Sequence, residues 1–140
     1  MSNDDLNSTK NSEFKYPKNE KLKSRKTIES LFSVGNSVSK YPLRLVFVEN
    51  ESTVAEKIKF GVSVSKKNFK KAVDRNYFKR VLRECYRLNK HLIVANLNKS
   101  YSIMFFYQTK EFLSYQEINE KTIAIFEKFV KFISEQSSEV

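Results

Sequence analysis

The sequence is poor in the residues that cross-link, break or bend a chain. Its 140 residues include one cysteine, two glycines, two prolines and no tryptophan. The single Cys85 excludes a disulfide within the chain, and so few glycines and prolines leave no linker that would separate two domains. No apolar run approaches the ~20 residues that a membrane span requires, and the first residues lack the apolar stretch of a secretory signal. We therefore expect one small cytoplasmic domain without a membrane partner.

Groups that protein nucleases use for catalysis are also scarce. There are three aspartates, two of them within the first five residues, and one histidine. Protein nucleases typically hold Mg²⁺ between clustered carboxylates, but Asp74 and Glu84 would lie ~15 Å apart along a helix. His91 has no nucleophile beside it and is interpreted as a surface or capping residue, and Cys85 as a small apolar side chain. The sequence predicts no catalytic residue, no metal site and no cofactor bound by the protein alone.

Positive charge is abundant and concentrated in one segment. The chain has 26 Lys and Arg against 16 Asp and Glu, for a net charge of +10. Residues 66–90 hold ten of these cations and only Asp74 and Glu84, so +8 of the +10 lies there. Such a charge attracts polyanions and releases their counterions on contact. Nucleic acid is therefore the expected class of partner.

The residue pattern predicts an α+β fold in a single domain over residues 21–135. Residues 1–20 read as a disordered polar tail and residues 136–140 as a C-terminal tail. β-branched and aromatic runs predict strands over 42–48, 58–64 and 101–109.

Helices are predicted from apolar residues at helical spacing. Ile28, Leu31 and Phe32 indicate a short first helix that ends at Gly35, where we expect the left-handed cap that glycine favours. A long helix is expected from about Lys71 to Asn89. The last helix begins after Ser114, which forms a capping box with Glu117.

The long helix is predicted to have two faces. At about 100° per residue, a polar arc of about 140° holds Arg75, Asn76, Lys79, Arg80, Arg83 and Arg87. An apolar arc of similar width holds Tyr77, Phe78, Val81, Leu82, Cys85 and Leu88. Stacked cations repel one another by a few tenths of a kcal/mol per pair, so we expect a ligand to compensate them. Arginine binds phosphate in a bidentate way, which favours an RNA surface, although an incidentally basic solvated helix remains the alternative.

Residues 66–87 closely resemble the signature of the bacterial ribonuclease P protein family. Its helical pattern Arg-Asn-x-x-Lys-Arg-x-x-Arg-Glu is filled at every position from Arg75 to Glu84. Residues 60–67 resemble the family's strand before this helix, and residues 22–38 its opening helix and loop. One position departs from the pattern, because Tyr77 stands where the family often has a third basic residue.

The resemblance implies a small four-stranded sheet flanked by helices. The order is α-β-β-β-α-β-α, with a left-handed crossover through the basic helix, although the general rule for parallel crossovers favours the opposite hand. It also implies a protein subunit that promotes endonucleolytic removal of the 5′ leader from precursor tRNA, while the catalytic RNA supplies the active site with Mg²⁺.

Two binding surfaces follow from the resemblance. The surface for the catalytic RNA would comprise Lys66, Lys67, Lys71, Arg75, Asn76, Lys79, Arg80, Arg83 and Arg87. A cleft for the single-stranded leader would comprise Ile28, Phe32, Arg44 and Val46, although Ile28 and Phe32 could equally be core residues. Phe32 could stack on a base without sequence preference. A structural RNA-binding protein of the ribosomal kind is the main alternative function. A helix-turn-helix DNA-binding protein is disfavoured, because no short helix and tight turn precede the basic helix.

Overall fold

The computed structural model describes residues 20–22, 25–51 and 56–138. In these ranges the elements are α2 (Arg25–Val34), β1 (Asn36–Lys40), β2 (Leu43–Glu49), β3 (Ile58–Val64), α3 (Ala72–Asn89), α4 (His91–Val94), β4 (Tyr101–Tyr107) and α5 (Tyr115–Ser138). This order confirms the predicted fold, with the short helix α4 added before β4. None of the helices in this part of the chain is long and apolar enough to span a membrane.

The four strands form one mixed sheet in the order β1-β2-β4-β3. β1 and β2 pair antiparallel, as do β2 and β4, whereas β3 and β4 pair in parallel. A parallel pair requires a long connection, and here α3 and α4 provide it. The left hand that the resemblance implies for this connection stays a prediction.

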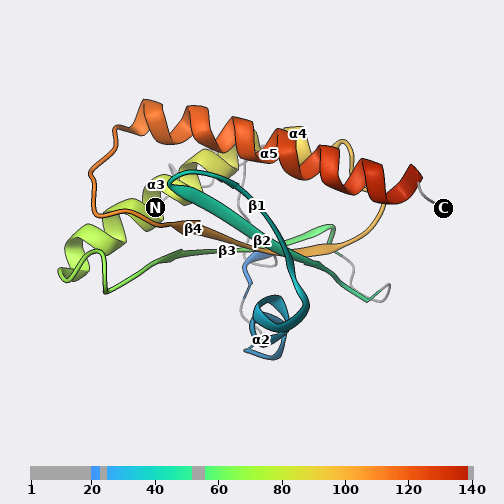
Figure 1. The fold of residues 1–140 in the computed structure, drawn as a ribbon, viewed down its shortest axis with the longest axis horizontal. Coiled ribbons are helices and arrows are strands. Elements are labelled where there is room, and N and C mark those ends of the chain that lie inside the picture. Colours follow the sequence, from blue (N-terminus) through green and yellow to red (C-terminus); the bar gives the residue numbers. More distant parts are fainter. Residues whose placement is uncertain (1–19, 23–24, 52–55, 139–140) are drawn as a thin grey trace, which may run out of the picture.

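Helices cover both faces of the sheet. α3 and α5 lie on one face and α2 on the other (Figure 1). The main core lies under α3 and α5, where Phe47 of β2 meets Phe129 of α5 edge to face, with ring centroids 4.6 Å apart. A smaller apolar contact forms under α2, where Leu31 and Val46 are both buried. The sheet therefore places α3 on the face opposite α2.

The end of α2 differs from its prediction. No described glycine has a positive φ, so the predicted left-handed cap at Gly35 is wrong. Glycine is required there because a Cβ atom at Gly35 would clash with the backbone carbonyl oxygen of Leu31, and it would also lie 3.1 Å from Cγ1 of Val46 in β2. The following residues, which the resemblance places in a loop, form the edge strand β1. This strand was hard to foresee because both of its faces are largely exposed and polar.

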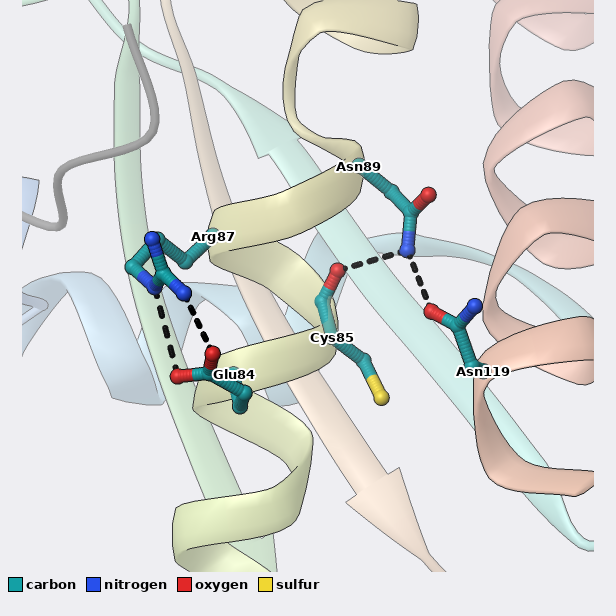
Figure 2. A network of polar contacts seen from close by, with 5 residues as sticks. All are labelled: Glu84, Cys85, Arg87, Asn89 and Asn119. Atoms are coloured by element: carbon teal, nitrogen blue, oxygen red, sulfur yellow. Dashed lines mark hydrogen bonds and ion pairs between the residues drawn. The ribbon is translucent and has the colours of Figure 1, made fainter. Parts of the chain in front are cut away.

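Polar contacts fix the start of α5 and the end of α3. At the start of α5, the Glu117 N–H donates to Oγ of Ser114 over 3.1 Å, which confirms the predicted capping box. Near the end of α3, the Asn89 amide donates to the Cys85 carbonyl over 2.8 Å and to Oδ1 of Asn119 in α5 over 2.7 Å (Figure 2). This bridge joins α3 to α5, so the position of α3 is set by polar as well as apolar contacts.

The predicted tail boundary falls on residues that the structure partly describes. Residues 1–19 lie outside the described part of the chain. Glu20 forms an ion pair with Lys90 over 2.7 Å, and the N–H of Leu22 donates to the Phe60 carbonyl over 2.9 Å. The chain thus already contacts β3 and the end of α3 at the residue where the domain was expected to begin.

Candidate nucleic-acid interface

α3 has the two faces that its sequence predicts. Its buried residues are Phe78, Val81, Leu82, Cys85, Tyr86 and Asn89. The side chains of Asn76, Arg80 and Arg83 are exposed, and those of Arg75, Lys79 and Arg87 are half-buried. Tyr77 is an exception, because the prediction places it on the core side and it is 40% exposed. Tyr77 stands at the edge of the apolar arc, next to the polar side of the helix.

Arg75 holds the loop that precedes α3. Its Nη1 donates to the carbonyls of Phe69 and Lys70 over 2.8 and 2.9 Å. The loop is also anchored by the buried ring of Phe69 and by the Lys67 N–H, which donates to Oγ of Ser65 over 2.9 Å. Arg75 therefore fixes where the loop lies relative to the helix.

The anchored loop adds cations to the polar face of α3. The side chains of Lys66, Lys67, Lys70 and Lys71 are all exposed. They precede the N-terminus of α3, where the helix dipole also favours anions. The loop and the first three turns of α3 thus carry eight exposed or half-buried cations, which we call the basic face: Lys66, Lys67, Lys70, Lys71, Arg75, Lys79, Arg80 and Arg83.

Charge on the last turn of α3 is partly compensated. Arg87 and Glu84 form a two-point ion pair, in which Nε of Arg87 donates to Oε2 over 3.2 Å and Nη2 donates to Oε1 (Figure 2). The hydrogen bond to Glu84 is the main cause of the raised pKa of Arg87. Arg87 is thus the one sequence-predicted RNA-binding residue that forms an ion pair within the part of the chain that the structure describes.

The residues predicted to line the leader cleft lie at α2 and on the sheet face beneath it. Arg44 and Val46 alternate with the buried core residues of β2 and so point to the α2 side. Arg44 is exposed, and its Nη2 donates to Oγ of Ser37 over 3.5 Å, whereas Val46 is buried. Ile28 of α2 is half-buried, and the side chain of Phe32 lies outside the described structure.

One residue of this face was missed by sequence reasoning. Phe106 of β4 pairs with Arg44 on one side and with Ser63 on the other, and its side chain is half-buried. Phe105 beside it points into the main core. Successive side chains of a strand point to opposite faces of the sheet, so Phe105 and Phe106 must lie on different faces. No residues of the run 101–109 were assigned to the α2 side from the sequence, and Phe106 was therefore missed.

The described residues contain no group of three or more His, Cys, Asp or Glu that could hold a metal ion. Cys85 is fully buried, and desolvation raises the pKa of its thiol to about 11, against a smaller opposing effect of the hydrogen bond with Thr122. A thiol with this pKa is protonated and unreactive near neutral pH. Cys85 is a buried packing residue, as its place on the apolar arc predicts.

Comparison with known proteins agrees with the resemblance. A family model described as Ribonuclease P matches residues 16–130. The ribonuclease P protein component of Dictyoglomus turgidum is 33% identical over 113 residues, which are 81% of this chain and 91% of that protein. The corresponding component of Porphyromonas gingivalis is 44% identical over 80 residues, or 57% of this chain, so the chain spans 58% of that relative's length.

Solved structures show the same fold. The RNase P protein from Thermotoga maritima aligns with a TM-score of 0.63 at 25% identity, covering 78% of this chain and 96% of that chain. The Staphylococcus aureus RNase P protein aligns with a TM-score of 0.64 at 21% identity, covering 77% of this chain and 93% of that chain. The second similarity concerns the fold alone.

Proposed function

Because the chain belongs to the ribonuclease P protein family, we propose that it is the protein subunit of ribonuclease P. In this role it binds the catalytic RNA and the 5′ leader of precursor tRNA and promotes endonucleolytic removal of the leader. The RNA subunit supplies the active site and uses Mg²⁺, and the protein itself contributes no catalytic group.

The observation that carries this proposal is the basic face. Its cations come from a loop and a helix that are held together by Arg75, and the pairing of Glu84 with Arg87 leaves the first three turns of α3 rich in positive charge. Guanidinium and ammonium groups at successive helical turns suit the phosphates of an RNA backbone. We assign the catalytic RNA to this face.

The leader is assigned to the opposite face of the sheet. Arg44 offers an exposed guanidinium there, with Phe106 beside it and α2 at one border. Because α2 and α3, the helix that carries the basic face, lie on opposite sides of the sheet (Figure 1), the two RNAs would not compete for one surface. Ile28, Phe32 and Val46 complete the proposed cleft.

A cleavage assay tests the proposed function. The cognate ribonuclease P RNA is incubated with precursor tRNA at low Mg²⁺, with and without the protein. Addition of protein should accelerate removal of the leader, and protein without RNA should leave precursor tRNA intact. If the protein binds the RNA but leaves the cleavage rate unchanged, it is instead a structural RNA-binding protein. Specific cleavage by RNA-free protein would show that the active site lies in the protein, which contradicts the proposal.

The leader assignment has its own test. Arg44→Gln removes an exposed charge whose hydrogen bond to Ser37, within the described part of the chain, is itself exposed, so the fold should be retained. We expect the reconstituted complex to bind precursor tRNA more weakly while its affinity for mature tRNA stays unchanged. Lys131→Gln, on the exposed side of α5, is the matched control. Equal losses for the two tRNAs would remove Arg44 from the leader cleft.

The same comparison applies to Phe32→Ala. Loss of a stacked base should cost roughly 1–3 kcal/mol of precursor affinity. Loss of a core ring should instead reduce the free energy of unfolding by about 3–5 kcal/mol. Thermal unfolding measured beside the two tRNA affinities distinguishes the outcomes, and a large drop in melting temperature would return Phe32 to the core.

A further inference from the structure

Two aromatic side chains are exposed beside the basic face. Phe112, in the connection between β4 and α5, is 65% exposed, and Tyr77 of α3 is 40% exposed. Both rings contact Phe78, with centroid separations of 5.2 Å for Phe112 and 5.0 Å for Tyr77. We call these two residues the aromatic pair. Tyr77 is also the position at which this chain departs from the basic pattern of its family.

Phe112 is held in its exposed position. Its ring meets that of the buried Phe69 edge to face, with centroids 5.2 Å apart. The hydroxyl of buried Tyr107 donates to the carbonyl of Glu111 and accepts the N–H of Leu113 over 3.1 Å. The backbone is thus fixed on both sides of Phe112. An aromatic ring anchored in this way is presented to solvent by the fold.

Tyr77 connects the aromatic pair to the cations of α3. The guanidinium carbon of Arg80 lies 5.5 Å from the centroid of the Tyr77 ring, within the range of a cation–π contact. Arg80 is itself exposed and belongs to the basic face. An aromatic surface and a phosphate-binding surface therefore adjoin each other at Arg80.

The combination fits unpaired nucleotides. A base stacked on an aromatic ring gains affinity without sequence preference, and arginines beside the ring bind the flanking phosphates. A base in a duplex has both of its faces covered, so only a loop, bulge or single strand can use the rings. We propose that Tyr77 and Phe112 stack on unpaired bases of the RNA whose backbone lies on the basic face. This inference rests on the proposed function, because it takes the catalytic RNA as the partner.

Charge favours RNA over a second copy of the chain as the occupant. Two copies that met through the aromatic pair would bring two basic faces together, and like charges at close range oppose association. An RNA strand would be attracted by the same charges. The exposed carboxylate of Glu111 borders Phe112, so we expect the phosphates to lie on the Arg80 side of the rings.

Binding of the full-length protein to cognate ribonuclease P RNA tests the inference. Phe112→Leu and Tyr77→Leu keep an apolar side chain but remove the stacking surface. Each should weaken binding by roughly 5- to 100-fold and leave the slope of log K against log salt unchanged, since no phosphate contact is lost. Val34→Ser, an exposed apolar residue of α2 on the opposite face of the sheet, should have no effect.

The outcomes separate this inference from the proposed function. If wild-type protein fails to bind the RNA, the proposed function is wrong. If wild-type protein binds and both leucine variants bind equally well, the aromatic pair alone is wrong. Photo-cross-linking of wild-type protein to RNA containing 5-bromouridine provides a readout that does not depend on variants folding. It should label peptides containing Tyr77 or Phe112, and labelling confined to other peptides would overturn the inference, as would a dimer in sedimentation that Phe112→Leu dissolves.

Discussion

Arg75 shows how a single side chain serves both the fold and the proposed interface. Its sequence context predicts a phosphate contact, and the structure adds two hydrogen bonds to the loop before α3. The planar guanidinium is pre-organised, whereas the ammonium of lysine stands on a flexible stem and loses more side-chain entropy for each hydrogen bond formed. The position of the loop lysines relative to α3 thus depends on this residue.

Replacement of Arg75 by lysine should therefore loosen the loop although the charge is kept. We expect Arg75→Lys to lower the free energy of unfolding by about 1–3 kcal/mol, the usual contribution of hydrogen bonds to a charged donor. Hydrogen exchange should become faster at the amides of residues 66–71. Arg83→Lys, at an exposed position of the same helix, is the control and should leave exchange in the loop unchanged. Equal exchange rates in both variants would show that Arg75 does not hold the loop.

The buried thiol of Cys85 makes stability depend on alkaline pH. Burial raises its pKa from 9.0 to about 11. Above pH 9 the unfolded state releases the thiol proton while the folded state keeps it, so the unfolded state binds fewer protons and stability falls as pH rises. The contribution of this thiol is fully present below about pH 9 and is lost as the pH approaches about 11.

Urea unfolding at pH 8 and pH 10 measures this effect in wild-type protein and in Cys85→Ala. The raised pKa values of buried Tyr107 and half-buried Tyr101 contribute the same trend to both proteins. The alanine variant is expected to be less stable at pH 8 because of its cavity, but to lose less stability between the two pH values. Parallel losses in the two proteins would show that the Cys85 thiol does not titrate with a raised pKa.

At the scale of elements, the Asn89 bridge sets how α3 lies against α5. Its side chain is almost fully buried, with both amide N–H groups used (Figure 2). Without the Asn89 amide, the part-buried Oδ1 of Asn119 loses its donor, and an unsatisfied buried acceptor costs about 1–3 kcal/mol, more than the net contribution of a typical hydrogen bond. The apolar contacts around it do not fix the rotation of α3 in the same way, because they are not directional.

Asn89→Ala should lower the free energy of unfolding by about 1–3 kcal/mol. Asn76→Ala is the matched control, since it changes the same residue type at an exposed position of the same helix and should change stability by less than about 0.5 kcal/mol. Chemical denaturation with urea gives both values. A cost as small for Asn89 as for Asn76 would mean that the bridge does not stabilise the helix pair.

The elements with strong periodic patterns were predictable, and those without them were not. α3 and α5 have apolar arcs that match their buried faces, and β2, β3 and β4 are the β-branched and aromatic runs. β1 and α4 have no such pattern, because β1 is exposed on an edge and α4 is a single turn. The sheet order β1-β2-β4-β3 depends on contacts between distant residues, which local periodicity does not record.

At the scale of the whole molecule, a residue can belong to the predicted site only if it lies on an exposed face. The angular positions of Arg80 and Arg83 on the helix were sufficient to predict their exposure. They were not sufficient for Tyr77, which stands at the edge of the apolar arc, because the angular position alone does not decide burial there. Phe112 lies in a connection without periodicity, so the sequence carries no signal for its exposure or for the two hydrogen bonds by which Tyr107 fixes the backbone on either side of it.

The layered fold gives the chain two surfaces on opposite sides of one sheet. α3 presents the basic face on one side, and α2 borders the Arg44 surface on the other (Figure 1). A protein so arranged can bind a large RNA with one side and a second strand with the other. The basic face is the side that we assign to the phosphate backbone of the catalytic RNA.

The salt dependence of RNA binding by an Arg80→Gln, Arg83→Gln double variant tests that claim most directly. Each phosphate contact that is lost should reduce the slope of log K against log salt by up to about one unit. Lys131→Gln, a charge change on the exposed side of α5, should leave the slope at the wild-type value. We predict weaker binding and a slope shallower by up to about two units in the double variant. A slope equal to that of wild-type protein would show that the basic face does not bind the RNA.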